Sequence, residues 1–206
     1  MTKHSSTESS LAILLLAAGA SSRMRGGDKL LEDVDGVPLL RKLAGHACAV
    51  CDTVLVCLRD FDEARRSVLS GMHSQQVVVP DATNGMAHSL RAGIAQLPEH
   101  ISGVMVVPAD MPELSEQDLR TMIAVHEALP NAILRATSAD SQPGHPVLFP
   151  SNLFGELRAL SGDVGARGVL KRHADAVRLI ALPERHALTD LDTPEAWQAW
   201  RQACPK

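Results

Sequence analysis

LLLAAGASSRMRGGDKLL, residues 14–31, joins an apolar strand directly to a loop of small residues. The loop also carries Arg23, Arg25 and Lys29. Small residues let backbone N–H groups approach phosphate oxygens, and cationic side chains supply the charge that phosphates need. The stretch therefore predicts a binding site for a nucleoside triphosphate.

Neither of the two commonest phosphate-binding loops fits this stretch. Gly19 is not followed by the Gly-Lys-Ser/Thr of a P-loop, and Gly19, Ser21 and Met24 break the dinucleotide-binding pattern. The loop must therefore be a third type of phosphate-binding loop.

The composition indicates a compact protein that binds small ligands. The 206 residues are 45% hydrophobic and carry a net charge of −4, so we expect one domain over residues 11–203 after a disordered polar tail over residues 1–10. Only 2% of residues are aromatic, which argues with the charge against a nucleic-acid surface. No apolar run reaches the roughly 20 residues needed to span a membrane, and no signal peptide is evident, so we expect a cytoplasmic protein.

Strand-like and helix-like stretches alternate along the first half of the chain. The expected strands cover residues 12–17, 53–58, 76–79 and 103–107, and the expected helices cover 38–47, 62–69, 85–96 and 115–129. The second half adds strands at 132–136, 146–149 and 177–181, with helices at 153–160, at 165–172 and from residue 193. The pattern predicts a three-layer α/β/α fold with a mostly parallel, doubly wound sheet.

Cys48 and Cys51 form a C-x-x-C pattern, which is also seen in redox and zinc sites. The pattern has no second metal-binding pair and lies in an apolar run between a helix and a strand. We expect these cysteines to be buried small side chains.

Three loops with unusual composition follow the expected strands that end near residues 17, 79 and 107. They contain, in order, the glycine-rich stretch, the segment Thr83–Ser89, and Asp110 between two prolines. Ligands of open α/β sheets bind at the carboxyl ends of the strands. We therefore expect the three loops to meet at one crevice.

Several motifs together resemble one family. LAAGxSxRM at the first loop, PADMP at 108–112, GMAHSL at 85–90 and DLDTPE at 190–195 resemble nucleotidyltransferases of the glycosyltransferase-A-like (nucleotide-diphospho-sugar transferase) fold. GHPV at 144–147 and GDVGAR at 162–167 resemble the branch that contains molybdenum cofactor cytidylyltransferase and molybdopterin-guanine dinucleotide synthase. The chain departs from the usual RMG at RMRGG, which leaves the role of Arg25 open.

The resemblance implies a magnesium site. It gives Asp110 the role of metal ligand and catalytic residue, with Asp192 or Asp190 as the second carboxylate; we favour Asp192. Mg²⁺ prefers oxygen ligands and is typically held by one or two carboxylates plus the substrate phosphates. The alternatives are that Asp110 caps a turn and that Asp192 anchors the following helix.

The resemblance also implies a nucleotide site. Arg23 and Lys29 would be catalytic and would neutralise charge on the α-phosphate and the departing pyrophosphate. The expected nucleotide-binding residues are Ala17, Ala18, Gly19, Arg23, Lys29, Thr83, Asn84, Gly85 and Ser89. The simplest alternative for the two cations is a solvated surface.

The motifs of the second half imply an acceptor site, with Arg167 suited to a phosphate and His145 at the pocket wall. The resemblance then implies transfer of CMP from CTP, or GMP from GTP, to the phosphate of molybdopterin, with release of pyrophosphate. A molybdoenzyme or its chaperone would be a further partner. Two alternatives stay open: transfer to a sugar phosphate or another phosphorylated acceptor, and a non-catalytic molybdenum cofactor carrier.

Overall fold

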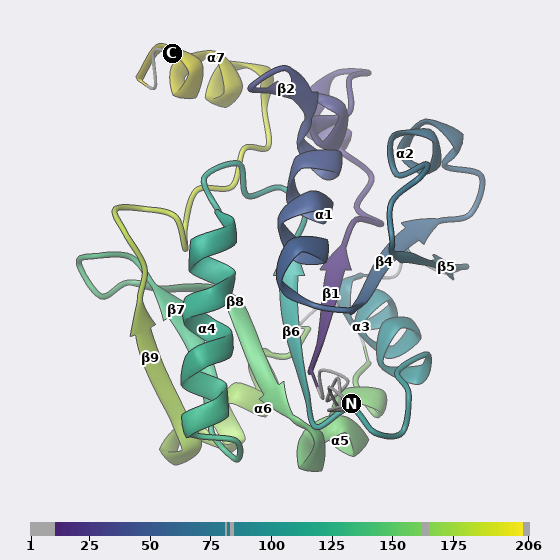
Figure 1. Ribbon diagram of the computed structural model, residues 1–206. Coiled ribbons are helices and arrows are strands. Elements are labelled where there is room, and N and C mark those ends of the chain that lie inside the picture. The colour runs from purple at the N-terminus through teal and green to yellow at the C-terminus, as the bar shows by residue number, and fades with distance from the viewer. Residues whose placement is uncertain (1–10, 81, 83–84, 162–164, 204–206) are drawn as a thin grey trace, which may run out of the picture.

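The computed structural model describes residues 11–80, 82, 85–161 and 165–203. Its main sheet has seven strands: β1 (Leu11–Leu16), β4 (Thr53–Arg59), β5 (Gln75–Val79), β6 (Gly103–Pro108), β7 (Ile133–Thr137), β8 (Pro143–Pro150) and β9 (Val177–Ala181). Their order across the sheet is β5-β4-β1-β6-β8-β7-β9. All pairs are parallel except those that β8 makes with β6 and β7 (Figure 1).

Helices cover both faces of this sheet. One face packs against α1 (Leu39–Val50) and α4 (Glu116–Ala128), and the other against α3 (Met86–Ala95), α5 (Phe154–Arg158) and α6 (Arg167–Arg172). The last helix, α7 (Pro194–Ala203), lies beyond one end of the sheet and joins the first core through Trp197 (Figure 1). A further helix, α2 (Glu63–Val68), lies near β4 and β5 (Figure 1). The predicted three-layer α/β/α architecture is therefore confirmed.

The apolar pattern of β1 explains why the sheet is covered on both sides. Ile13 and Leu15 are fully buried in the core of the α1 face, while Ala12 and Leu14 are fully buried in the core of the α3 face. A methyl group on Gly93 of α3 would lie 2.3 Å from the Leu14 side chain, so this glycine lets the helix approach β1 closely. Tight packing here fixes the start of the glycine-rich loop.

Two helices begin at residues whose side chains cap them. Ser115 and Asp118 form a reciprocal capping box at the start of α4. Thr193 accepts a hydrogen bond from Ala196 N at 3.2 Å, and Pro194 is the first residue of α7. Both helix starts are therefore specified locally.

The antiparallel strand β8 brings the second half of the chain to the ligand-binding edge. Val106 of β6 pairs with Val147 of β8, so the first residues of β8 lie beside the end of β6. His145 at the start of β8 therefore lies at the same edge as Asp110, which follows β6.

Two local features differ from or refine the expectations. The hairpin of β2 (Asp33–Val34) and β3 (Val37–Pro38) was not predicted, because two-residue strands are too short to show a pattern. Cys51 is buried and its thiol donates to Leu11 O at 3.2 Å, while Cys48 is half-buried. The fourth cysteine, Cys204, lies outside the described residues.

In the part of the chain that the structure describes, no helix combines the length and apolar character needed to cross a membrane.

Candidate functional site

A pocket of about 380 Å³ opens at the carboxyl edge of β1 and β6. The three loops that the sequence singled out all contribute to it. Its lining comprises Leu16, Ala18, Gly19, Arg23, Lys29, Leu30, Ala82, Gly85, Met86, Ser89, Pro108, Asp110, Asp190 and Asp192.

Four charged side chains form a connected cluster in this pocket. Lys29 Nζ donates to Asp110 Oδ2 and to Asp192 Oδ1, each at 2.5 Å. Arg23 Nη2 lies 2.7 Å from Asp192 Oδ2. The structure thus brings together cations and carboxylates that are up to 169 residues apart in the chain, as the sequence predicted.

The cluster shifts the protonation equilibria of its members. Burial opposes the charge on Lys29, but Asp110 and Asp192 outweigh burial and raise the pKa of its ammonium group. Burial, together with the negative charges of Asp110 and Asp192, raises the pKa of Asp190. The three carboxylates therefore repel one another, and a cation bound between them would relieve that repulsion.

The carboxylates fit a divalent metal ion held jointly with a substrate. Asp110 Oδ1 is buried and has no hydrogen-bond partner, so one hard oxygen ligand is free beside Asp190 and Asp192. Among the described residues, no three or more His, Cys, Asp or Glu side chains already form a metal-binding group. This donor set suits Mg²⁺, which is usually held by one or two carboxylates and completed by phosphates and water.

Lys29 is positioned by its neighbour Asp28. Asp28 caps the short 3₁₀ helix η2 (Lys29–Leu31) by accepting a hydrogen bond from Leu30 N at 3.0 Å. Burial opposes the charge on Asp28, but Arg65 outweighs it, and the pKa of Asp28 is lowered. Asp28 thus stays a carboxylate and fixes the backbone that carries Lys29.

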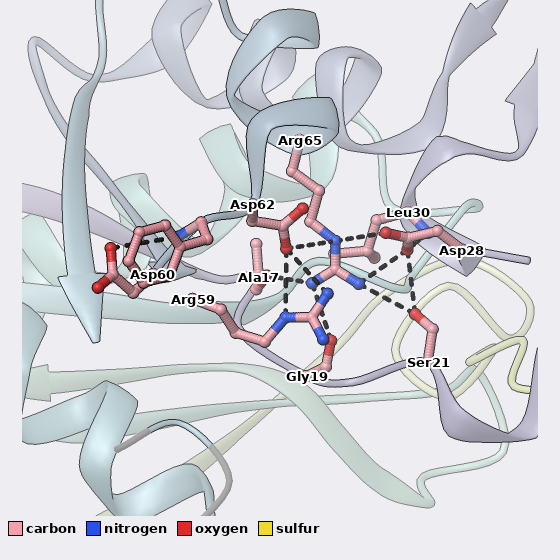
Figure 2. A network of polar contacts seen from close by, with 10 residues as sticks. Ala17, Gly19, Ser21, Asp28, Leu30, Arg59, Asp60, Asp62 and Arg65 are labelled. Atoms are coloured by element: carbon pink, nitrogen blue, oxygen red, sulfur yellow. Dashed lines mark hydrogen bonds and ion pairs between the residues drawn. The ribbon is translucent and has the colours of Figure 1, made fainter. Parts of the chain in front are cut away.

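Arg65 of α2 links this cap to the glycine-rich loop (Figure 2). Its side chain is fully buried. It donates to both carboxylate oxygens of Asp28 at 2.7 and 2.8 Å, to Ala17 O at 2.6 Å and to Gly19 O at 2.8 Å. Ser21 Oγ accepts a further bond at 3.0 Å. One guanidinium group therefore ties the end of β1 to the start of η2.

The sequence analysis did not identify Arg65. Glu63-Ala64-Arg65-Arg66 is typical of an exposed helix surface, and charged residues are rarely fully buried. A signal was present, since Arg65 lies one helical turn before the buried Leu69 and therefore on the apolar face.

We expect Arg65→Met to lower the free energy of unfolding by about 3–5 kcal/mol, because Asp28 would lose its buried cationic partner. Urea denaturation measures the effect, with the half-buried neighbour Arg66 changed to Met as the matched control. The control should cost less than about 0.5–1 kcal/mol. Equal losses for the two variants would show that the Arg65 network does not stabilise the loop.

The small residues expected to bind the nucleotide fall into three groups. Ala18, Gly19, Gly85 and Ser89 line the pocket, and a methyl group on Gly19 would meet no atom within 4 Å, so its surface is open. Ala17 is fully buried and lies behind the lining. Thr83 and Asn84 lie outside the described residues.

A second cavity, of about 320 Å³, adjoins the first at Met86, which lines both. His145 and Arg167, the two residues expected at the acceptor site, line this cavity with Arg135 and Phe149. The first three residues of GDVGAR, 162–164, lie outside the described residues.

His145 is neutral at physiological pH. Burial and the positive charges of Arg135 and Arg167 outweigh the negative charge of Asp110 and lower the pKa of the imidazole to about 4. Its Nδ1 is buried without a hydrogen-bond partner. The ring therefore has an unused polar atom at the wall of the second cavity.

Two details of the site refine the expectations. Arg25, whose role the sequence left open, is not part of the pocket lining and pairs with Glu195 of α7 at 2.6 Å. Asp190 and Asp192 lie in a segment that is neither helix nor strand, and both side chains line the pocket. Their segment makes one long contact, from Leu191 N to Asp110 O at 3.4 Å, and no ladder forms.

Comparison with known families gives one extensive match. The model described as MobA-like NTP transferase domain matches residues 13–177, which include the whole lining of the second cavity and that of the first except Asp190 and Asp192.

Two curated relatives match nearly their whole length. A probable molybdenum cofactor guanylyltransferase of Synechococcus elongatus is 30% identical over 90% of this chain and 95% of its own. The purine catabolism protein PucB of Bacillus subtilis is 28% identical over 92% and 95%. The chain also matches bifunctional GlmU proteins, but it spans only about a quarter of their length, 26% for the protein of Leifsonia xyli.

A solved structure has the same architecture. The crystal structure of Rv0371c from Mycobacterium tuberculosis superposes with a TM-score of 0.81 at 29% identity, over 92% of this chain and 95% of that one. A second structure of Rv0371c is a complex with manganese, with a TM-score of 0.77 at 26% identity over 94% and 99%.

Proposed function

The chain belongs to the family of MobA-like NTP transferase domains and is a nucleotidyltransferase. We propose that it transfers CMP from CTP to the phosphate of molybdopterin and releases pyrophosphate. The observation that carries the proposal is the Lys29, Arg23, Asp110 and Asp192 cluster at the mouth of a small-residue pocket.

The chain's own groups account for binding of the triphosphate. Arg23 and Lys29 turn from their carboxylate partners to the phosphate oxygens and stabilise the charge that develops on the leaving pyrophosphate. Ala18 and Gly19 shape the phosphate end of the pocket, with Ala17 buried behind them, while Gly85 and Ser89 face the ribose and base from the start of α3. Thr83 and Asn84 belong to the same proposed site.

Asp110 and Asp192 hold Mg²⁺ in this proposal, with Asp190 as the alternative to Asp192. The manganese complex of Rv0371c supports a divalent ion in the family. When bound, the ion neutralises the triphosphate and screens the carboxylates from it.

The reaction needs no protein base. A phosphate monoester is already an anion near pH 7, so an oxygen of the acceptor phosphate attacks the α-phosphorus directly. The bond from the α-phosphorus to the oxygen bridging the β-phosphorus breaks, and that oxygen leaves with pyrophosphate. His145, held neutral by its surroundings, and Arg167 bind the acceptor beside the reacting phosphates.

A pyrophosphate-release assay tests the proposal. CTP, GTP, ATP and UTP are each supplied with Mg²⁺, with and without molybdopterin. The GHPV and GDVGAR motifs support CTP as donor, and the name of the Synechococcus relative makes GTP the alternative. Release that requires both CTP and molybdopterin supports the proposal. Release with a sugar phosphate alone, or tight cofactor binding without any release, would contradict it.

We expect Arg167→Ala to raise the KM for the acceptor, or to lower turnover, by roughly ten- to a hundredfold, because one charge-assisted contact to phosphate is lost. CTP affinity measured by calorimetry without acceptor should barely change. Arg178→Ala is the control, since this exposed arginine donates to the nearby carbonyls of Asp175 and Val177 and lines neither cavity. If Arg167→Ala loses CTP binding and keeps acceptor affinity, the two cavities are assigned the wrong way round.

A further inference from the structure

The acceptor cavity continues into a second hollow. A groove of about 460 Å³ shares Arg135, Arg167 and Leu170 with the 320 Å³ cavity and extends to Lys171 and Leu179. The two volumes form one elongated space that runs from Met86, at the nucleotide pocket, to β9. Figure 1 shows α6 and β9 toward the β9 edge of the sheet, whereas α2 lies near the opposite edge, formed by β5.

All the charged residues that line the described part of this space are positive. Arg135, Arg167 and Lys171 are cations, and no described Asp or Glu side chain lines either part. The nucleotide pocket, in contrast, mixes two cations with three carboxylates. The elongated space therefore favours an anionic ligand that brings no metal ion with it.

Arg135 is placed to contact such a ligand. Among the described residues, its guanidinium group donates to the carbonyls of Gly144 and Pro143 alone, at 3.3 and 3.4 Å, which are long contacts. Burial and the positive charge of Arg167 both lower its pKa. Its charge is thus unbalanced by any described carboxylate, and an anion between the two arginines would compensate both.

Arg167 and Lys171 extend the same cationic face. They are four residues apart in α6, so their side chains leave one side of the helix, and like charges at this spacing are mutually unfavourable. The remaining walls are apolar, and they include Val177 and the exposed Leu179. Cavities with apolar walls and a few fixed polar groups are typical of small-molecule sites.

We propose that Arg135 and Lys171 form a subsite for a second anionic group of the acceptor, separate from the phosphate that reacts, and that Arg167, which lines both parts of the space, lies between the two groups. The identity of the acceptor in this proposal is taken from the proposed function. The reacting phosphate lies near His145 and Met86, where the cavities meet, and the second anionic group lies at the far end. The protein thus selects an acceptor that carries two negatively charged groups, one at each end of the molecule.

The test compares two probes that differ only in the second charge, pentyl phosphate and 1,5-pentanediol bisphosphate. Binding is measured by calorimetry at low ionic strength, where surface charges are little screened, with a non-hydrolysable CTP analogue filling the nucleotide pocket. The full chain should bind the bisphosphate about ten- to a hundredfold more tightly than the monophosphate.

Two variants show where the preference arises. The variants are Lys171→Met, at an exposed residue, and Arg135→Met, at a half-buried residue. Each should remove most of the preference for the bisphosphate and leave the affinity for pentyl phosphate nearly unchanged. Arg178→Met, outside the groove, should keep the preference. Equal binding of the two probes by the unchanged protein, no binding of either, or a preference that survives both substitutions would overturn the subsite.

This assay measures no turnover, so its failure and the failure of the proposed function are distinguishable. A chain that binds the bisphosphate preferentially but releases no pyrophosphate keeps the subsite and loses the proposed reaction. A chain that transfers CMP without that preference keeps the reaction and loses the subsite.

Discussion

Asp110→Asn is expected to lower turnover by about 10²–10³-fold or more while the protein stays folded, because an amide keeps the shape of the side chain but removes its charge. Asp110 Oδ1 is the buried oxygen without a partner, and Oδ2 accepts from Lys29. Asp192 retains its own bond to Lys29 in the variant, so the cluster keeps a carboxylate for the ammonium group.

Turnover, circular dichroism and Mn²⁺ binding in the presence of CTP together check this prediction. Asp52→Asn, at an exposed position outside both cavities, is the matched control and should leave all three unchanged. Metal binding should fall with turnover. A folded Asp110→Asn protein with nearly normal activity would remove Asp110 from the reaction.

Lys29→Ala is expected to lower kcat/KM for the triphosphate by roughly ten- to a hundredfold or more, because the loop loses the cation that is best placed to meet the phosphates. Lys29 is about 87% buried, with a side-chain exposure of 13%, and two carboxylates hold it in the pocket lining. Its charge therefore acts where water screens little.

Arg25→Ala is the internal control for Lys29→Ala. Arg25 lies in the same loop, but it is 72% exposed and pairs with Glu195, and exposed pairs of this kind contribute little. Steady-state kinetics at varied CTP should show less than about a twofold change for Arg25→Ala. Equal losses for the two variants would mean that the phosphate contacts are placed wrongly.

The sequence predicted the sheet and the meeting of its loops because both follow from local rules. Strands such as Val104–Val107 are apolar on both faces, which is typical of a covered parallel sheet, and the loops after such strands share one edge. The order in which β8 and β7 insert beside β6 does not follow from these rules. The placement of His145 next to Asp110 therefore needed the structure.

The polar contacts that support the site could not be predicted in the same way. Arg65 reaches Asp28 from 37 residues away, and nothing in the spacing of either residue specifies that contact. Lys29 and Asp192 were each identified from a motif, but their direct contact across 163 residues depends on how the segment after β9 returns to the sheet. Motifs thus identified the charged groups, while long-range folding decided which of them pair.

The most direct test of the account is to follow the label of radioactive CTP in the presence of molybdopterin and Mg²⁺. Transfer of a nucleoside monophosphate predicts that label from the α-phosphate appears in the acceptor product and that label from the γ-phosphate appears only in pyrophosphate, both dependent on molybdopterin. Label from the γ-phosphate in the acceptor would show phosphoryl transfer instead. Retention of both labels in unreacted CTP would show that the chain only binds its ligands, and either result would contradict the account.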